Sequence, residues 1–324
     1  MRLLIVFLCF SIYSNAQHPI AFDTQSDFAF IKKNLSSNSI LKNSYAEVKQ
    51  SVDAWLGKDV DVPLPKDAQG GYTHDRHKEN YMLIFNGGLL FNLTGDKKYA
   101  LLVKNILLKY AGLNPTLQTH PLATSSSPGH LFWQALNDAN WLVYAALGYD
   151  LIYNSLTVTD RKLIEDGAFK PEVEFITNDL DSWFNLIHNQ AVWGCAGVGI
   201  TGIVLNNQDY INKALYGTKG DKKSGFIALI DQLFSPDGYY TEGPYYARYA
   251  ILPFYLFANA LEHVKPELKI FRYRNQLLRK ALVSVLQQTN IDGRFFPVND
   301  AMKDKDFTTY ELVTAIAIAR NVYG

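Results

Sequence analysis

The stretch Asp237-Gly-Tyr-Tyr-Thr-Glu-Gly-Pro-Tyr-Tyr-Ala-Arg-Tyr249 joins a turn to a helix, and it decides how the chain is interpreted. Glycine and proline interrupt it, and the apolar run Ala250-Ile-Leu-Pro-Phe-Tyr-Leu-Phe257 follows directly. This order predicts a turn that leads into an apolar helix. Five tyrosines, one glutamate and one arginine therefore surround a helix N-terminus. Tyrosines there can stack on sugars or transfer protons, although tyrosines more often serve as core or rim residues.

Similar helical segments fill the rest of the chain. The patterns predict about ten or eleven helices and almost no strand with period two. The main helical segments are 26–55 (two helices), 81–93, 99–110, 131–153, 183–205, 226–234, 246–263, 268–288 and 308–321, the last opened by a capping box at Thr308–Glu311. Short connections favour antiparallel neighbours, and no fixed-period repeat indicates a solenoid. The expected fold class is therefore all-α, an α/α toroid of helical hairpins.

Composition narrows the possible partners. The chain has 324 residues and 48% hydrophobic residues, which is enough for a substantial core. Its 31 basic and 31 acidic residues cancel, so no basic face indicates nucleic acid or an anionic membrane as a partner. The 14% of aromatic residues suit carbohydrate contact. No segment after the N-terminus is expected to span a membrane, and the oligomeric state is not predicted.

The N-terminus has the pattern of a signal peptide. Met1-Arg2 precedes the apolar run from Leu3 to Tyr13, and a small-x-small sequence ends at Ala16. We therefore expect residues 1–16 to be removed and residues 17–324 to form the toroid domain, in the bacterial periplasm or secreted. The remaining cysteine, Cys195, cannot form an intrachain disulfide.

Five stretches, in this order, resemble polysaccharide lyase family 17, the oligoalginate lyases of the heparinase II/III-like group. They are Gly70-Gly-Tyr-Thr-His-Asp-Arg-His-Lys78, Leu131-Phe-Trp-Gln-Ala-Leu-Asn137, Ile187-His-Asn189 with Trp193, Asp237–Tyr249, and Phe296-Pro-Val-Asn-Asp-Ala301. The resemblance implies an incomplete α/α toroid. Family members continue into a C-terminal β-sheet domain, so the resemblance also implies that this chain is truncated within the toroid and lacks that domain.

The resemblance further implies β-elimination at a uronic acid. Asn189 corresponds to the asparagine that neutralises the substrate carboxylate, and Tyr246 to the tyrosine that moves the proton, with Tyr245 as the second choice. In mannuronate the C5 proton and the leaving oxygen lie on one face, so one tyrosine can act as base and then as acid. A phenol with a pKa near about 10 needs help to act as a base, and Arg248 is the nearest cation in the sequence. Its alternative role is a surface or salt-bridged arginine.

One position departs from the family pattern. Gln190 stands where the family has a histidine, and glutamine cannot act as an acid or base. His188 is no substitute, because adjacent helical residues point about 100° apart. We expect Gln190 and His188 to contact substrate, and Gln190 restricts the expected substrate to mannuronate-type or related uronates.

The polar segment at 72–78 is the expected source of positive charge in the cleft. We expect Tyr72, His74, Arg76, His77 and Lys78 to bind the acidic sugar, although a solvated helix start is the alternative. His77 has no partner at metal-binding spacing, and neither a metal nor a cofactor is expected. Asn137, Asn140 and Trp141 are interpreted as core or supporting residues.

The sequence thus predicts a lyase that acts on alginate or oligoalginate. Three alternatives remain open. The first is a lyase that acts on another uronate-containing glycan. The second is a glycoside hydrolase, which would need two facing carboxylates such as Glu242 and Asp300. The third is a non-catalytic oligosaccharide-binding protein.

Overall fold

The structure, a computed structural model, describes residues 18–123, 126–299 and 301–324. The signal peptide predicted at residues 1–16 lies outside these ranges. The described residues form helices and three isolated β-bridges but no strand, which confirms the all-α prediction. In the same ranges, no helix combines the length and apolar character needed to cross a bilayer.

Fourteen α-helices make up the described chain. They are α1 (Gln25–Asn34), α2 (Ser39–Asp53), α3 (Tyr72–Thr94), α4 (Lys97–Leu113), α5 (Ala135–Ile152), α6 (Val158–Ile164), α7 (Lys170–Glu174), α8 (Asp181–Phe184), α9 (Asn189–Val204), α10 (Gln208–Tyr216), α11 (Gly225–Leu233), α12 (Pro244–Val264), α13 (Tyr273–Gln287) and α14 (Tyr310–Tyr323). Two π-helical segments, Glu165–Phe169 and Phe175–Asp179, flank α7.

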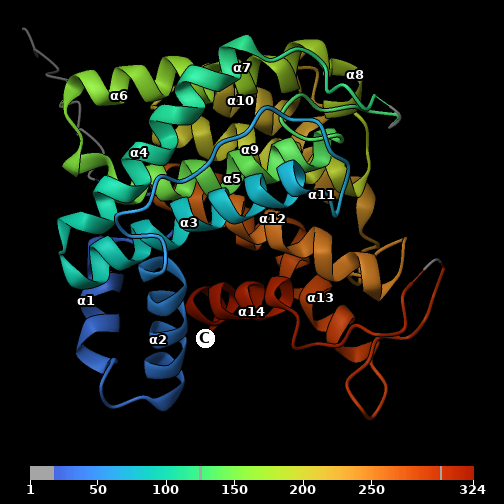
Figure 1. The fold of residues 1–324 in the computed structure, drawn as a ribbon. Helices are drawn as coiled ribbons and strands as arrows, with labels where there is room; N and C mark the ends of the chain where they lie inside the picture. Colours follow the sequence, from blue (N-terminus) through green and yellow to red (C-terminus); the bar gives the residue numbers. More distant parts are fainter. Residues whose placement is uncertain (1–17, 124–125, 300) are drawn as a thin grey trace, which may run out of the picture.

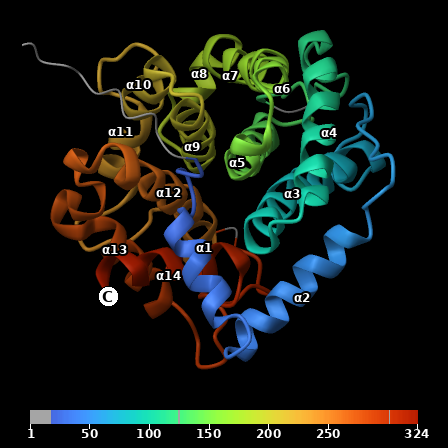
Figure 2. The ribbon, with the colours of Figure 1, turned by 90° about the vertical axis from the view of Figure 1, so that its left-hand side faces the viewer.

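The helices form two concentric layers (Figures 1 and 2). In the inner layer α3, α5, α9, α12 and α14 pack each against the next. In the outer layer α4 packs on α3, α10 on α9, and α13 on α12, while α1 and α2 pack against α3. Alternation of inner and outer helices around a ring is the arrangement of an α/α toroid, as the sequence predicted.

Two inner helices, α5 and α9, are apolar on nearly every side, which is why they occupy the middle of the protein. All residues of α9 from Ala191 to Val204 are buried. Glycine lets these helices approach closely: a β-carbon added at Gly199 would lie 2.2 Å from the ring of Phe257 on α12. The small residues of α9 therefore determine how closely it packs against α12.

Four predicted helix starts were wrong. The helix expected over 268–288 begins at Tyr273, after two 3-10 turns at Pro266–Leu268 and Ile270–Arg272. The helix expected from residue 131 begins at Ala135, because the Asp138 carboxylate accepts hydrogen bonds from the Leu131 and Phe132 amides and holds them in a loop. The helix expected over 183–205 is split into α8 and α9, with His188 extended at φ −157°. The helix expected from residue 81 begins nine residues earlier, at Tyr72.

The capping box expected at Thr308–Glu311 does not form. Thr309 is the N-cap residue of α14, and its side chain makes no capping hydrogen bond. The Thr308 hydroxyl donates instead to Asp306 at 2.5 Å.

Candidate functional site

The N-terminal ends of α9 and α12 are joined through one carboxylate. Asn189 is the first residue of α9, and its Nδ2 donates a hydrogen bond of 2.7 Å to Oε2 of Glu242. The Tyr240 hydroxyl donates to the same oxygen at 3.1 Å. Gly243, at φ 82°, then turns the chain into α12. This geometry brings together the two stretches that the sequence singled out, although they are 53 residues apart.

Both helix ends are suited to an anion. The first amides of a helix have no partner within the helix, and they give its N-terminus a positive partial charge. Asn189 lies in the first turn of α9, and Tyr245 and Tyr246 lie in the first turn of α12. A carboxylate bound beside these turns would be stabilised by backbone dipoles as well as by side chains.

Gln190 is held with its donor group available. Its Oε1 accepts a hydrogen bond of 3.1 Å from Nε1 of Trp183, so its amide nitrogen is left to donate elsewhere. His188 Nε2 lies 3.2 Å from the backbone oxygen of Trp183. Burial lowers the pKa of His188, which favours the neutral imidazole. This end of α9 therefore offers amide donors and no fixed cation.

The two adjacent tyrosines have different surroundings. Tyr245 is buried, and the Arg248 guanidinium lies over its ring at 4.7 Å. Tyr246 is half-buried, and its ring packs edge-on against Tyr245 at 5.1 Å. Of the two, Tyr246 is the more accessible to a ligand.

Arg248 does not have the role expected for it. It is buried, and its Nη1 pairs with Oε1 of Glu311 at 2.8 Å. Positions three apart share a helix face, whereas positions two apart do not, so Arg248 covers Tyr245 and not Tyr246. Its alternative role, a salt-bridged arginine, is the one that the structure shows.

A cavity of about 430 Å³ lies one turn further along α9 and α12. Trp193 and Tyr249 form part of its wall, with ring centroids 5.2 Å apart, and Tyr144 and Tyr310 add two further rings. Asn137, Asn140, Gln134 and Gln69 supply amides, and Lys78 and Glu311 supply charges. Aromatic faces with interspersed amides can stack on and hydrogen-bond to sugar rings.

Two of the five residues at 72–78 lie in this wall. His74 and Lys78 both line the cavity, as expected for positions four apart on one helix face. Lys78 is exposed, whereas His74 is buried and burial lowers its pKa. Arg76 points the other way, and its Nη2 donates to Oδ1 of Asn80 at 2.8 Å. Arg76 is therefore not part of this cavity wall, and its contact with substrate stays a prediction.

His77 and Tyr72 are also directed away from the cavity. His77 is fully buried, and its Nδ1 lies 2.8 Å from the Tyr110 hydroxyl. Burial lowers its pKa to about 3. Tyr72 is exposed, and its hydroxyl donates to Asp61 at 2.7 Å. Neither residue lines the cavity, so their contact with substrate stays a prediction.

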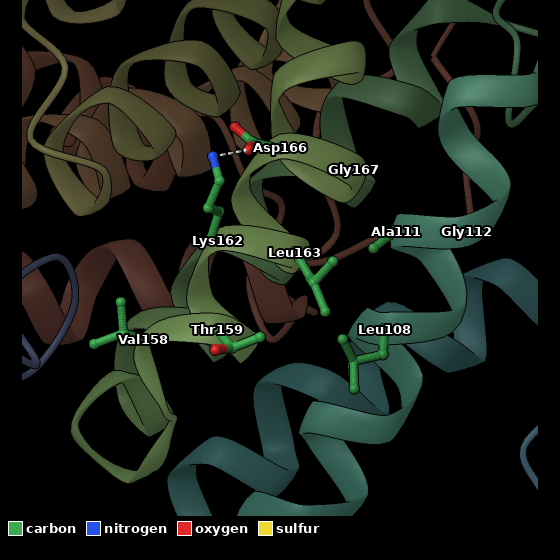
Figure 3. A pocket seen from close by; sticks show the side chains of 9 residues that line it. All are labelled: Leu108, Ala111, Gly112, Val158, Thr159, Lys162, Leu163, Asp166 and Gly167. Carbon is green, nitrogen blue, oxygen red and sulfur yellow. Dashed lines mark hydrogen bonds and ion pairs between the residues drawn. The ribbon is translucent and has the colours of Figure 1, made fainter.

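A larger groove of about 570 Å³ lies on the outer layer, between α4 and α6 (Figure 3). Leu108, Val158 and Leu163 line it, and Lys162 pairs with Asp166 at 2.7 Å across its rim. No aromatic ring, histidine or amide side chain is among the lining residues. It is therefore not a candidate for sugar binding.

The sequence matches the alginate lyase family over residues 41–296. The chain belongs to the alginate lyase family. It is 46% identical, over 307 residues, to an exo-oligoalginate lyase of Saccharophagus degradans, covering 95% of this chain and 42% of that protein. It is 47% identical, over 274 residues, to an alginate lyase of Stenotrophomonas maltophilia, covering 85% of this chain and 37% of that protein. The chain therefore spans about two fifths of these relatives.

Solved alginate lyases have the same fold. An alginate lyase from Bacteroides ovatus superposes with a TM-score of 0.66 at 14% identity, covering 94% of this chain and 92% of that one. Alginate lyase A1-III from a Sphingomonas species superposes with a TM-score of 0.59 at 15% identity, covering 95% and 92%. At such identities the likeness establishes the helical architecture of an alginate lyase and no more.

Several residues of this family member's cavity were missed from the sequence. Asn137 and Asn140 were interpreted as core or supporting residues, yet both line the cavity, and Asn140 Nδ2 lies 3.4 Å from the Tyr249 hydroxyl. Tyr144 and Tyr310 were not considered. Nothing in the sequence marks them, because they reach the cavity from separate helices whose arrangement only the folded ring fixes.

Proposed function

We propose that this chain is the toroid of a lyase that cleaves alginate or oligoalginate at mannuronate-type residues by β-elimination. The observation that carries the proposal is the junction of α9 and α12, where Glu242 ties Asn189 to the turn that precedes Tyr246. Membership of the alginate lyase family supports the reaction class. The relatives named alginate lyase and exo-oligoalginate lyase support the substrate class.

Neutralisation of the substrate carboxylate falls to Asn189, Gln190 and the N-terminal amides of α9. One hydrogen of the Asn189 amide is bound to Glu242, and the other can donate to the substrate. Gln190 supplies a second amide donor, because Trp183 occupies its oxygen. Donors fixed in place before the reaction stabilise the negative charge that develops at the carboxylate when the C5 proton leaves.

Tyr246 removes the C5 proton and returns it to the leaving oxygen. The C5–H electron pair forms the C4–C5 double bond, the bond from C4 to the glycosidic oxygen breaks, and the tyrosine proton passes to that oxygen. A phenolate is needed at the first step, and the positive end of the α12 dipole favours it. The N-terminus of α12 therefore supplies the positive charge that we had expected from Arg248.

The cavity beyond the junction would hold further sugar units. Tyr249 presents a ring for stacking, with the buried Trp193 packed against it, and Lys78 offers a cation to an acidic sugar. A Sphingomonas A1-III variant has been solved with a bound tetrasaccharide, at a TM-score of 0.53 to this chain over 84% of it and 80% of that protein, which supports an oligosaccharide as the ligand. We further propose export to the periplasm or outside the cell, on the signal-peptide pattern of residues 1–16.

The alternative functions differ in the residue on which activity would depend. A hydrolase would depend on Glu242, but Asn189 and Tyr240 already bind its Oε2, and Asp300 lies outside the described residues. A binding protein would hold an oligosaccharide without cleaving it. A lyase acting on another uronate would use the same tyrosine, with a substrate preference set at Gln190.

A lyase assay on the purified chain tests the proposal. Polymannuronate, polyguluronate, their oligomers and heparan-type chains are offered in turn, and ultraviolet absorbance follows the unsaturated uronate. We expect activity on mannuronate substrates that Tyr246→Phe abolishes and that Tyr245→Phe, its neighbour, retains. Binding of oligomannuronate by calorimetry without any turnover would replace the lyase proposal with the binding protein, and loss only in Glu242→Gln would favour the hydrolase.

A further inference from the structure

A second group of chemically reactive side chains is buried near the start of α5 and α7. His130 comes from the loop before α5, Asp138 from the first turn of α5, and Glu172 from α7. Their exposed fractions are 5%, 0% and 0%. His130 Nε2 lies 2.5 Å from Oε2 of Glu172, and the three side chains each offer an atom within 4.8 Å of the others.

Two carboxylate oxygens in this cluster lack a donor. Oδ1 of Asp138 accepts from the backbone amides of Leu131 at 2.8 Å and Phe132 at 3.3 Å, but its Oδ2 has no hydrogen-bond partner among the described residues. Oε1 of Glu172 is also buried and also has no hydrogen-bond partner among the described residues. Buried acceptors are nearly always satisfied in native proteins, so these atoms indicate a missing proton, water or cation.

The charges around the cluster favour a cation. The charges acting on His130 belong to Glu172, Asp138 and Asp179, and all three are negative. A buried water could satisfy the free oxygens, but it would bring no positive charge to the buried carboxylates, and uncompensated buried charge is costly.

We infer that His130, Asp138 and Glu172 bind one divalent metal ion, with Zn²⁺ as the ion whose ligand preferences fit best. One imidazole nitrogen and two carboxylate oxygens are ordinary zinc ligands, and three protein ligands leave a fourth position for water. The ion displaces the proton between His130 and Glu172, which passes to solvent. Ligand atoms of tetrahedral zinc lie roughly 3–4 Å apart, so His130 and Glu172 separate slightly while the cluster stays within its present size.

An entry route lies next to the cluster. A cavity of about 440 Å³ between the loop after α4 and the α7 region has His130 in its wall, with Asp179 and Glu174 beside it. Carboxylates at the mouth attract a cation, and His130 links this cavity to the buried oxygens. The spacing of residues 130, 138 and 172 matches no short metal-binding motif, so this cluster could not be recognised from the sequence.

Such an ion would stabilise the wall of the substrate cavity and would not take part in the reaction. Asp138 fixes the loop that carries Phe132, and the Phe132 ring packs edge-on against His74 at 5.1 Å. His74 in turn lines the cavity beside α9 and α12. The bound ion therefore stabilises one wall of the cleft through the loop at residues 129–134.

Metal content and thermal unfolding of the purified full chain test the inference. After treatment with a chelator and dialysis, ZnCl₂ is titrated by calorimetry, with MnCl₂, CaCl₂ and MgCl₂ in parallel. We expect one equivalent of Zn²⁺ to bind and to raise the unfolding midpoint. Glu172→Gln keeps the size and an acceptor for His130, and it should weaken Zn²⁺ binding by at least about tenfold.

Glu174→Gln is the matched control, because Glu174 is on the same helix, lines the adjacent cavity and is exposed. It should bind Zn²⁺ as the unmodified chain does. Absence of equimolar binding together with an unchanged midpoint would overturn the inference and leave a buried water or proton in the cluster. Equal binding by the chain and by Glu172→Gln would place the ion at a surface histidine and would also overturn it. Circular dichroism of both variants, and Asp138→Asn as a second ligand change, separate loss of a ligand from loss of fold.

Discussion

The hydrogen bond from Asn189 to Glu242 leads us to predict a coupling free energy between the two side chains. The bond is 2.7 Å long and its acceptor is a carboxylate, and bonds to charged groups contribute about 1.5–3 kcal/mol net. Both side chains are only half-buried, so water replaces part of the bond when either is removed. We therefore expect a coupling free energy near the lower limit, about 1.5 kcal/mol.

A double-mutant cycle measures that coupling. Urea unfolding is followed for the unmodified chain, Asn189→Ala, Glu242→Ala and the double variant, which requires no enzymatic activity. The same cycle on kcat/KM should show a coupling of about tenfold, since a misoriented Asn189 no longer meets the substrate carboxylate. Tyr240→Phe is the control, because it removes the other bond to the same oxygen and leaves the Asn189 bond in place. Free energies that add to within about 0.3–0.5 kcal/mol would refute the reasoning.

Two further predictions concern the scaffold. Gly199→Ala places a carbon 2.2 Å from the Phe257 ring, so it should lower the free energy of unfolding by about 1–3 kcal/mol, although alanine has the better helix propensity. Gly112→Ala is the control, because Gly112 is at an open helical position, and it should not destabilise the protein. Equal effects of the two substitutions would contradict the packing argument. Burial lowers the pKa of His77 to about 3, so the unfolded chain takes up a proton below about pH 6.5 that the folded chain refuses. The free energy of unfolding should fall as the pH drops from 6.5 towards 3, by up to about 1.4 kcal/mol per pH unit. In denaturant titrations His77→Gln should reduce this dependence on pH. An unchanged dependence in the variant would show that other groups cause it.

The fold was predictable because its signals are local and strong. The apolar stretches that became α5, α9 and α12 can be buried only inside a helical layer, and short connections make consecutive helices neighbours. The helix starts were less predictable. Asp138 holds Leu131 and Phe132 out of α5 through side-chain hydrogen bonds, and no periodicity records such a bond.

The candidate site was predictable only where its residues lie close together in the sequence. Asn189, Gln190 and the tyrosine pair at 245–246 were identified from two short stretches. Arg248 was misjudged because proximity along the chain was taken for proximity in space, whereas the helix turns it towards Glu311. The contact between Asn189 and Glu242 could not be seen in either stretch alone, since it depends on how α9 packs against α12.

The distribution of charge explains why amides, and not cations, meet the substrate carboxylate in the proposed reaction. Arg248 is paired with Glu311, and burial lowers the pKa of both His74 and His188. Among the residues that line the cavity, Lys78 is the only lysine or arginine. Only interactions that strengthen in the transition state raise the rate. The interactions of the fixed amides and helix ends with the substrate carboxylate strengthen when the C5 proton leaves and negative charge develops there. Proton removal is the step at which a single tyrosine needs assistance.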